Sequence, residues 1–286
     1  MAITQTGGGG TGTGEVTTSL ILDGTVANAD LANMAALTVK VRAPNSSGVP
    51  SDLALTDGHA AKRVGTALVS GGYGPVSVSV LTSGTAATYT VPAGVYRLKV
   101  RMVGGGGGGG GGDGGSSNVG VGGGGNAGGY AEKIYSTTPG ATFTYTVGAL
   151  GGGGTAGNNA GTVGGQTLFN EGGSVVTCPG GAGGTSMAAG TTVLGNAGTA
   201  VVAPTGGDVN IGGAASSRGW RLSGTLWVGS NGASSMLGGG GLQGNNTAGA
   251  AGTGYGAGGG GGNSDNTTDR AGGDGTAGVI IVEEYN

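Results

Sequence analysis

Nine consecutive glycines at residues 104–112 follow directly on a strand-like run that ends at Val103. Shorter glycine runs recur at residues 122–125, 151–154, 238–241 and 258–262. Glycine loses more conformational entropy on ordering than any other residue, and an ordered glycine segment recovers that loss mainly through backbone hydrogen bonds and close packing. These runs therefore favour an interior that is built partly from backbone.

Glycine makes up 78 of the 286 residues, a composition that is otherwise typical of low-complexity, disordered chains. Only 9% of the residues are charged, the net charge is −3 and the mean hydropathy is +0.08, whereas disordered chains are usually charged and hydrophilic. Aromatic residues are 4%, too few for one conventional core. Extended helices of the polyproline II type can pack backbone against backbone only if they consist of glycine, which has no side chain. The composition therefore predicts packed polyglycine II helices.

Strand patterns surround the longest glycine run. Period-two alternation predicts strands at 76–81, 87–91 and 95–103, with Val95, Arg97, Lys99 and Arg101 on one face of the last and Tyr96, Leu98, Val100 and Met102 on the other. Further strands are expected at 129–135, 141–147, 166–170, 174–178 and 277–285. The turn residues Glu171, Gly172 and Gly173 predict a hairpin. The fold class is therefore predicted to be all-β, with polyglycine II helices packed among the strands.

Residues 1–75 have a composition closer to that of an ordinary protein than the glycine-rich remainder. The sequence predicts that they form a separate N-terminal segment, which ends in a linker that contains glycine and proline. We expect a glycine-rich lead, a strand at 18–22, a short helix at 31–37, strands at 39–42 and 52–56, and a second short helix at about 57–63. The glycine-rich domain is predicted to span residues 76–286.

Several functional classes are disfavoured. No cluster of Lys and Arg exists, so the footprint of a nucleic-acid-binding protein is absent. No Gly-Lys pair occurs and no helix pattern follows a glycine run, which argues against a nucleotide-binding loop. The single cysteine, Cys178, excludes an intrachain disulfide and is interpreted as a buried, inert thiol.

Catalysis is also disfavoured. The only histidine, His59, lies in the N-terminal segment and is interpreted as a solvated residue, far from any nucleophile of the glycine-rich domain. The carboxylates are sparse, and those near Asn263 and Asp269 lack the spacing of an EF-hand and are better explained as turn residues. Two carboxylates that are distant in the sequence could still be neighbours in the fold and act as the catalytic pair of a glycosidase, so this alternative stays open. We predict that the protein is not an enzyme and that it has no catalytic residue, no metal ligand and no cofactor.

The order of the motifs resembles a known family. Residues 89–95, the strand that enters the polyglycine run, and residues 128–133, 254–262 and 272–285 look like the glycine-rich domain at the ends of many bacteriophage tail fibre proteins. Residues 28–55 are similar to an upstream segment of such fibres, and the whole resembles phage tip adhesins in which polyglycine II helices stack and their loops contact a receptor.

This resemblance implies a function. The expected protein is a tail fibre or fibre-tip protein of the virion that acts outside the cell and adheres to a host outer-membrane protein or lipopolysaccharide. It would be held to the tail or to other virion proteins by its N-terminal segment, and by analogy with tail fibres it would be a homotrimer. The alternative is a structural fibre or decoration protein of the virion that makes no contact with the host.

Recognition is expected in the loops, because glycine helices carry no side chains. Trp220, Arg221 and Trp227 belong to types enriched at binding hot spots, although the two tryptophans are equally well interpreted as a hairpin that caps the glycine helices as a small core. A second, polar set of candidates could hydrogen-bond sugars or protein loops, or could simply be exposed turns. It consists of Asn245, Asn246, Asn263, Asp265 and Arg270.

Overall fold

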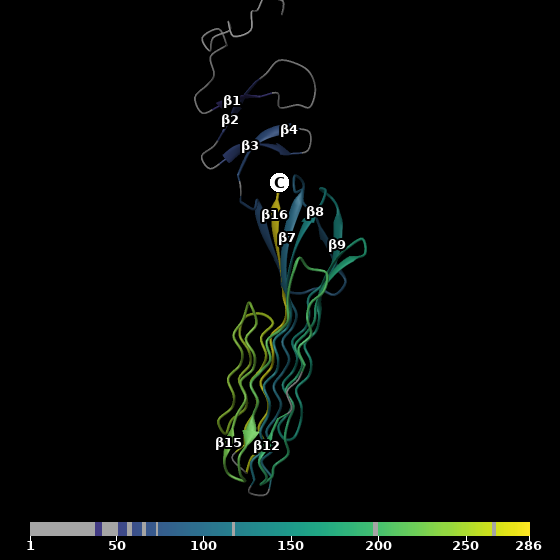
Figure 1. The fold of residues 1–286 in the computed structure, drawn as a ribbon. Helices are drawn as coiled ribbons and strands as arrows, with labels where there is room; N and C mark the ends of the chain where they lie inside the picture. Colours follow the sequence, from purple (N-terminus) through teal and green to yellow (C-terminus); the bar gives the residue numbers. More distant parts are fainter. Residues whose placement is uncertain are drawn as a thin grey trace, which may run out of the picture. The chain divides into compact units, whose positions relative to one another are not determined.

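The structure is a computed structural model that describes residues 38–41, 51–55, 59–64, 67–72, 74–115, 118–196, 200–264 and 267–286 (Figure 1). The chain divides into two compact units, Met1–Tyr73 and Gly74–Asn286. All of the secondary structure in the described residues is β-strand, so the all-β fold class is confirmed there. No described segment forms a helix that is long and apolar enough to cross a membrane.

Two antiparallel hairpins occupy the first unit. Strand β1 (Thr38–Val41) pairs with β2 (Ser51–Ala54), and β3 (His59–Val64) pairs with β4 (Ala67–Gly72). The helix expected at about 57–63 is wrong, because the backbone of β3 is hydrogen-bonded along its whole length to β4, from His59 opposite Gly72 to Val64 opposite Ala67. The strand and helix expected at 18–22 and 31–37 lie outside the described residues.

The second unit contains two antiparallel sheets that enclose a hydrophobic core, and we call this pair of sheets the sandwich. The five-stranded sheet has the order β13-β8-β7-β16-β5, and the four-stranded sheet has the order β11-β10-β9-β6. In chain order these strands are β5 (Ser77–Leu81), β6 (Ala87–Thr90), β7 (Arg97–Val103), β8 (Tyr130–Ser136), β9 (Thr142–Thr146), β10 (Thr167–Glu171), β11 (Ser174–Cys178), β13 (Val209–Ile211) and β16 (Val279–Tyr285).

The core between these sheets is conventional. Leu98, Val100 and Met102 of β7 are buried, which confirms the predicted alternation. Val95 is also buried, although the alternation assigned it to the charged face, because β7 begins only at Arg97. Both phenylalanines of the chain lie here with their ring centroids 4.8 Å apart, and Tyr89 and Tyr135 pack in the same core.

The predicted hairpin at residues 166–178 is confirmed as β10 and β11. Glu171 pairs with Ser174, and Gly172 and Gly173 form the turn with φ angles of 53° and 101°. Two successive residues with positive φ are the geometry of a tight hairpin turn, and glycine adopts it without strain.

A bundle of extended glycine segments continues from the sandwich, and residues 104–112 form its central helix (Figure 1). Every third N–H of this helix donates to the same neighbouring segment, at N–O distances of 2.8–3.0 Å. Residues 104, 107 and 110 donate to the carbonyls of Gly129, Asn126 and Gly123 in one segment. Residues 105, 108 and 111 donate to Gly165, Thr162 and Asn159 in a second segment. Residues 106, 109 and 112 donate to Thr276, Gly273 and Arg270 in a third. A repeat of three residues per turn is that of the polyglycine II helix.

The carbonyl groups of the central helix face three further segments. The N–H groups of Gly151 and Gly154 donate to residues 106 and 109, those of Gly181 and Gly184 to 105 and 108, and those of Gly259 and Gly262 to 107 and 110. The central helix therefore has six neighbours, three antiparallel and three parallel. All nine of its N–H groups, and its carbonyls at 105–110 and 112, are paired with backbone, and the carbonyl of Gly111 accepts from the Ser186 hydroxyl (2.6 Å), so the buried backbone has its partners.

Close approach explains why this helix is glycine throughout. A Cβ atom added to any residue from 104 to 112 would lie 1.9–2.6 Å from a backbone carbonyl oxygen of a neighbouring segment. In segments farther from the central helix, some positions are free of this restriction and carry side chains. Gly241 and Gly244 donate inward to Gly258 and Gly261, while Leu242 between them is 67% exposed.

Candidate functional site

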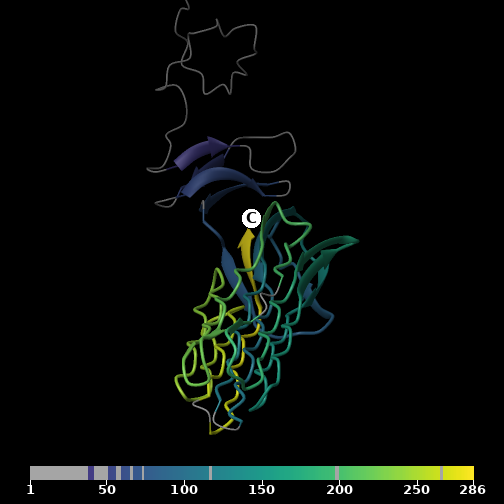
Figure 2. The same cartoon turned by 60° about the horizontal axis from the view of Figure 1, so that its bottom comes forward.

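Loops gather at the end of the bundle away from the sandwich, which we call the distal end (Figures 1 and 2). The last residues of the central helix locate them. The N–H groups of Gly111 and Gly112 donate to the carbonyls of Asn159 and Arg270, both at 2.8 Å, and Gly112 also forms a bridge with Met187. Segments that are far apart in the sequence are thus brought to one surface.

A small three-stranded sheet lies at the distal end, with the order β12-β14-β15. Its strands are β12 (Leu194–Gly195), β14 (Trp220–Arg221) and β15 (Trp227–Val228). The turn between β14 and β15 is held by hydrogen bonds from the Leu222 N–H to the Leu226 carbonyl (2.8 Å) and from the Leu226 N–H to the Ser223 Oγ (3.0 Å). The hairpin is therefore ordered by hydrogen bonds among its own residues.

Trp220 lies across this sheet and stays partly open to solvent. A Cβ atom added to Gly195 would lie 2.7 Å from the indole ring, so the ring packs directly on the backbone of β12. The side chain of Trp220 is nevertheless 42% exposed, and that of Trp227 is half-buried. The hairpin interpretation of the two tryptophans holds for the backbone, but Trp220 is not enclosed in a core.

Apolar side chains continue around Trp220 and form what we call the distal patch. The patch consists of Trp220, Leu222, Leu226 and Val228, each between 40% and 58% exposed, with Val228 directly opposite Trp220 in the hairpin. Isolated exposed apolar residues are normal, but a contiguous group on an ordered loop marks a surface that contacts something else. The distal patch is the candidate functional site.

Arg221 points away from the distal patch into the protein, so it is not exposed to contact a partner. Its side chain is buried, its Nε donates to the carbonyl of Thr192 (2.8 Å), and its Nη1 donates to the carbonyl of Ala188. A third bond runs from Nη2 to the Thr192 Oγ1 (3.3 Å). Arg221 thus ties the loop at 188–192 to the hairpin and supports the distal patch from below.

The polar candidates are brought together in part. Asn245 is exposed, Asn246 is half-buried with a φ of 55°, and the Nη2 of Arg270 donates to the Oδ1 of Asn246 (3.2 Å). Asn263 is buried and its Nδ2 donates to the carbonyl of Gly244 (2.6 Å), so it too is not exposed to contact a partner. Asp265 lies outside the described residues.

Cys178 and His59 lie in different units of the chain. Burial raises the pKa of the Cys178 thiol to about 12, and its Sγ–H donates to the carbonyl of Met102 (3.4 Å). His59 is exposed on β3 of the first unit, with its Nδ1 3.1 Å from the Ser70 Oγ. In the described part of the chain, no three His, Cys, Asp or Glu side chains are grouped so that they could hold a metal ion.

Sequence reasoning found Trp220 but missed the rest of the distal patch. Strands β12, β14 and β15 have two residues each, too short for any period-two pattern. One signal was present: Leu222, Leu226 and Val228 are large apolar residues in a segment that fits neither a long strand nor a repeat of glycine at every third position.

The chain was also compared with known proteins. A search of curated proteins gave no match. A family model described as a glycine-rich domain matches residues 81–285, which include the four-stranded sheet, the five-stranded sheet except for β5, and the whole bundle. Because this match spans well over half of the sequence, the chain belongs to the glycine-rich domain family.

Proposed function

We propose that this protein is a bacteriophage tail fibre or fibre-tip protein that binds a receptor on the host cell surface. The observation that carries the proposal is the distal patch, a group of exposed apolar side chains held on hydrogen-bonded loops at the free end of a glycine bundle. Trp220 at its centre belongs to the residue types that dominate binding energy at interfaces. The order of motifs that resembles phage fibres supplies the biological setting.

The scaffold supports this use. Its segments are tied by backbone hydrogen bonds from one end of the central helix to the other, so loops at the distal end are held with little freedom to lose on binding. Under this proposal the receptor is an outer-membrane protein or a lipopolysaccharide, and residues 1–75 attach the protein to the tail or another part of the virion. The protein acts by binding, without catalysis, on the virion surface outside the cell, as a homotrimer.

Adsorption to cells tests the proposal. The purified full chain is labelled and incubated with a panel of bacterial strains, and bound protein and blocking of infection are measured. The double variant Trp220→Ala, Leu226→Asp should reduce binding by about tenfold or more, because hot-spot side chains carry most of the affinity. Val163→Asp is the matched control, since Val163 is an exposed apolar residue (65%) in a segment of the bundle beside the central helix.

The outcomes separate the alternatives. Loss of binding in the double variant alone supports the distal patch as the receptor site. Failure of the wild-type chain to bind any strain that the phage infects would favour the non-adhesive structural protein. Release of reducing sugar from host polysaccharide would contradict a function without catalysis.

A further inference from the structure

Strand β5 carries a second exposed apolar row, on the sandwich and outside the distal patch. Val76, Val78 and Val80 are 53%, 51% and 53% exposed and project from the same face of the chain at alternate positions. The serine between the last two points the other way, where the Ser79 Oγ donates to the Glu284 Oε1 (3.0 Å). The valines are therefore on the outer face of the five-stranded sheet.

This strand is also an unprotected edge. Among the described strands β5 pairs only with β16, so one side of its backbone is unpaired. Natural sheets usually protect such edges with charged residues, proline or a bulge. Residues 77–81 are Ser-Val-Ser-Val-Leu and contain neither a charged residue nor proline. An edge of this kind is suited to contact with another chain.

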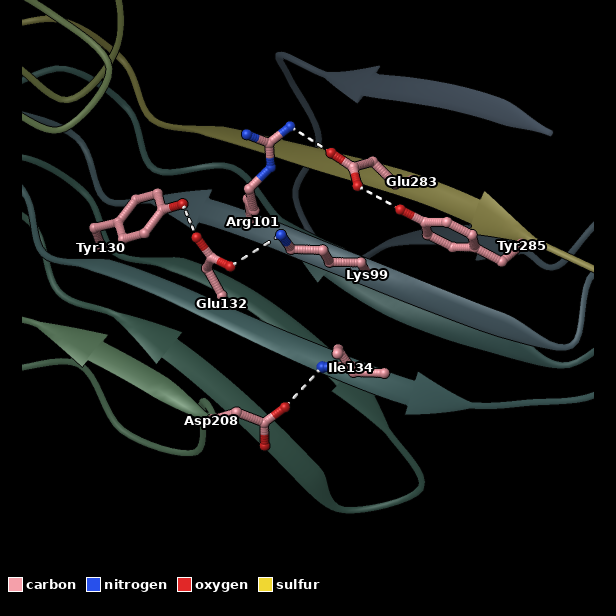
Figure 3. A network of polar contacts seen from close by, with 8 residues as sticks. All are labelled: Lys99, Arg101, Tyr130, Glu132, Ile134, Asp208, Glu283 and Tyr285. Atoms are coloured by element: carbon pink, nitrogen blue, oxygen red, sulfur yellow. Dashed lines mark hydrogen bonds and ion pairs between the residues drawn. The ribbon is translucent and has the colours of Figure 1, made fainter. Parts of the chain in front are cut away.

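The sheet beyond β5 extends the same face. Val78 lies opposite Glu283 of β16, Glu283 opposite Lys99 of β7, and Lys99 opposite Ile134 of β8. Ile134 is 55% exposed, so apolar side chains lie on both flanks of a charged band. Figure 3 shows this band along β7, β8 and β16.

The charged groups of the band are already paired with one another. Arg101 lies 2.6 Å from Glu283, and Lys99 lies 3.4 Å from Glu132, measured between nitrogen and oxygen (Figure 3). The Tyr130 hydroxyl that donates to Glu132 (2.6 Å), together with Lys99, holds the pKa of this carboxyl below its usual value. Arg97, on the same face, lies over the Tyr285 ring at 4.8 Å from its centroid. A partner that covers Lys99 and Arg101 therefore buries charges that are already paired, which avoids the main cost of burying them.

We propose that this outer face binds a second copy of the chain, with the valine rows of two β5 strands packed against each other in parallel. Because the row is uncharged and its members are identical, it is complementary to itself. The paired charges beside it have both signs, so two copies meet without strong repulsion. The parallel orientation rests on the proposed function, since a fibre attached at one end must point all of its distal patches the same way.

Crosslinking through single cysteines tests both the contact and its direction. Cys178 is buried and its thiol is not reactive, so a cysteine introduced at 76, 78 or 80 is the only accessible one in the described part of the full chain. With a short bifunctional maleimide, Val76→Cys, Val78→Cys and Val80→Cys should each give covalent oligomers. Val163→Cys, which is more exposed (65%) and lies on the bundle, should stay monomeric.

The pattern of products decides the proposal. Antiparallel strands would join position 76 to position 80, so that only Val78→Cys would crosslink by itself, and the parallel arrangement would be wrong. A monodisperse monomer at micromolar concentration, or equal crosslinking of Val163→Cys, would overturn the contact altogether. The double variant Val78→Asp, Val80→Asp should shift the wild-type oligomer to monomer in light scattering while its circular dichroism spectrum is unchanged.

The experiments distinguish an error in the proposed β5 contact from an error in the proposed receptor-binding function. Loss of cell binding in the distal-patch variant with an intact oligomer concerns the receptor site alone. Absence of crosslinking together with normal adsorption would remove the β5 contact and leave receptor binding standing. A three-armed maleimide on Val78→Cys measures the number of copies, and a product no larger than two chains would contradict the homotrimer.

Discussion

A Cβ atom added to Gly106 would lie 1.9 Å from the carbonyl oxygen of Ala257, in the segment beside the central helix. The contact is with backbone, and the backbone of Ala257 is itself held by a neighbouring segment through the N–H of Thr276 (2.9 Å). Neither side of this contact can move without breaking hydrogen bonds of the bundle. The absence of side chains in the central helix is thus a packing requirement.

We therefore expect Gly106→Ala to lower the free energy of unfolding by about 3 kcal/mol or more, or to prevent folding, because overpacking against a fixed backbone is severely destabilising. Gly152→Ala is the matched control. Its added Cβ would meet nothing closer than 3.7 Å, and the change should be neutral or stabilise by about 0.5 kcal/mol through the unfolded state. Urea unfolding of both variants measures the difference, and equal stabilities would contradict the packed bundle.

Amide hydrogen exchange tests the order of the central helix directly. Each N–H from 104 to 112 donates a hydrogen bond of 2.8–3.0 Å, and every one of these glycines is buried. Exchange should be as slow as in the central strand β7 and far slower than at the exposed turn glycines 172 and 173. Exchange of 104–112 at the rate of an unstructured peptide would mean that the glycine run is a flexible linker.

A buried carboxylate in the sandwich gives a third test. Glu284 is 3% exposed and accepts a hydrogen bond from the Tyr89 hydroxyl (2.7 Å). Tyr89→Phe should cost about 1–3 kcal/mol of unfolding free energy, because a buried charged acceptor loses a donor. Tyr285→Phe removes a similar bond to Glu283 (2.9 Å) on the outer face and should change stability by less than about 0.5 kcal/mol. A larger effect of the second substitution would be inconsistent with this assignment.

The stability of the protein should depend on alkaline pH through Cys178. Its pKa is raised by burial from 9.0 to about 12, so between these values the unfolded chain releases the proton while the folded chain keeps it. Stability therefore falls as pH rises above 9, and is unaffected by this group at lower pH. The difference in unfolding free energy between wild type and Cys178→Ala should narrow across this range. A constant difference would show that the thiol titrates normally in the folded state.

Much of the sandwich is predictable because its strands alternate. The sequence from Arg97 to Val103 defines both faces of β7, and the paired glycines at 172 and 173 define a hairpin. The first unit was harder, since residues 59–64 form a strand only through their pairing with β4. A short segment without caps carries no local signal that decides between helix and strand.

The distal end was predictable only in outline. Trp220 was identified by its type, but whether Arg221 and Asn263 point outward depends on which face of its strand or segment each residue occupies. That choice is fixed by contacts with segments distant in sequence, as Arg221 shows through its bonds to Ala188 and Thr192. A repeat of glycine at every third residue, as at 241 and 244, was the one local signal of facing that the sequence carried.

The hydrogen-bond repeat of the central helix also limits how such a bundle can change during evolution. Removing one residue from a segment would rotate the remainder by a third of a turn and present every donor to the wrong neighbour. Removing three residues, about 9 Å of length, restores the match. Lengths within the bundle should therefore drift in steps of three codons, while the distal loops, which are outside this repeat, are free to vary one residue at a time.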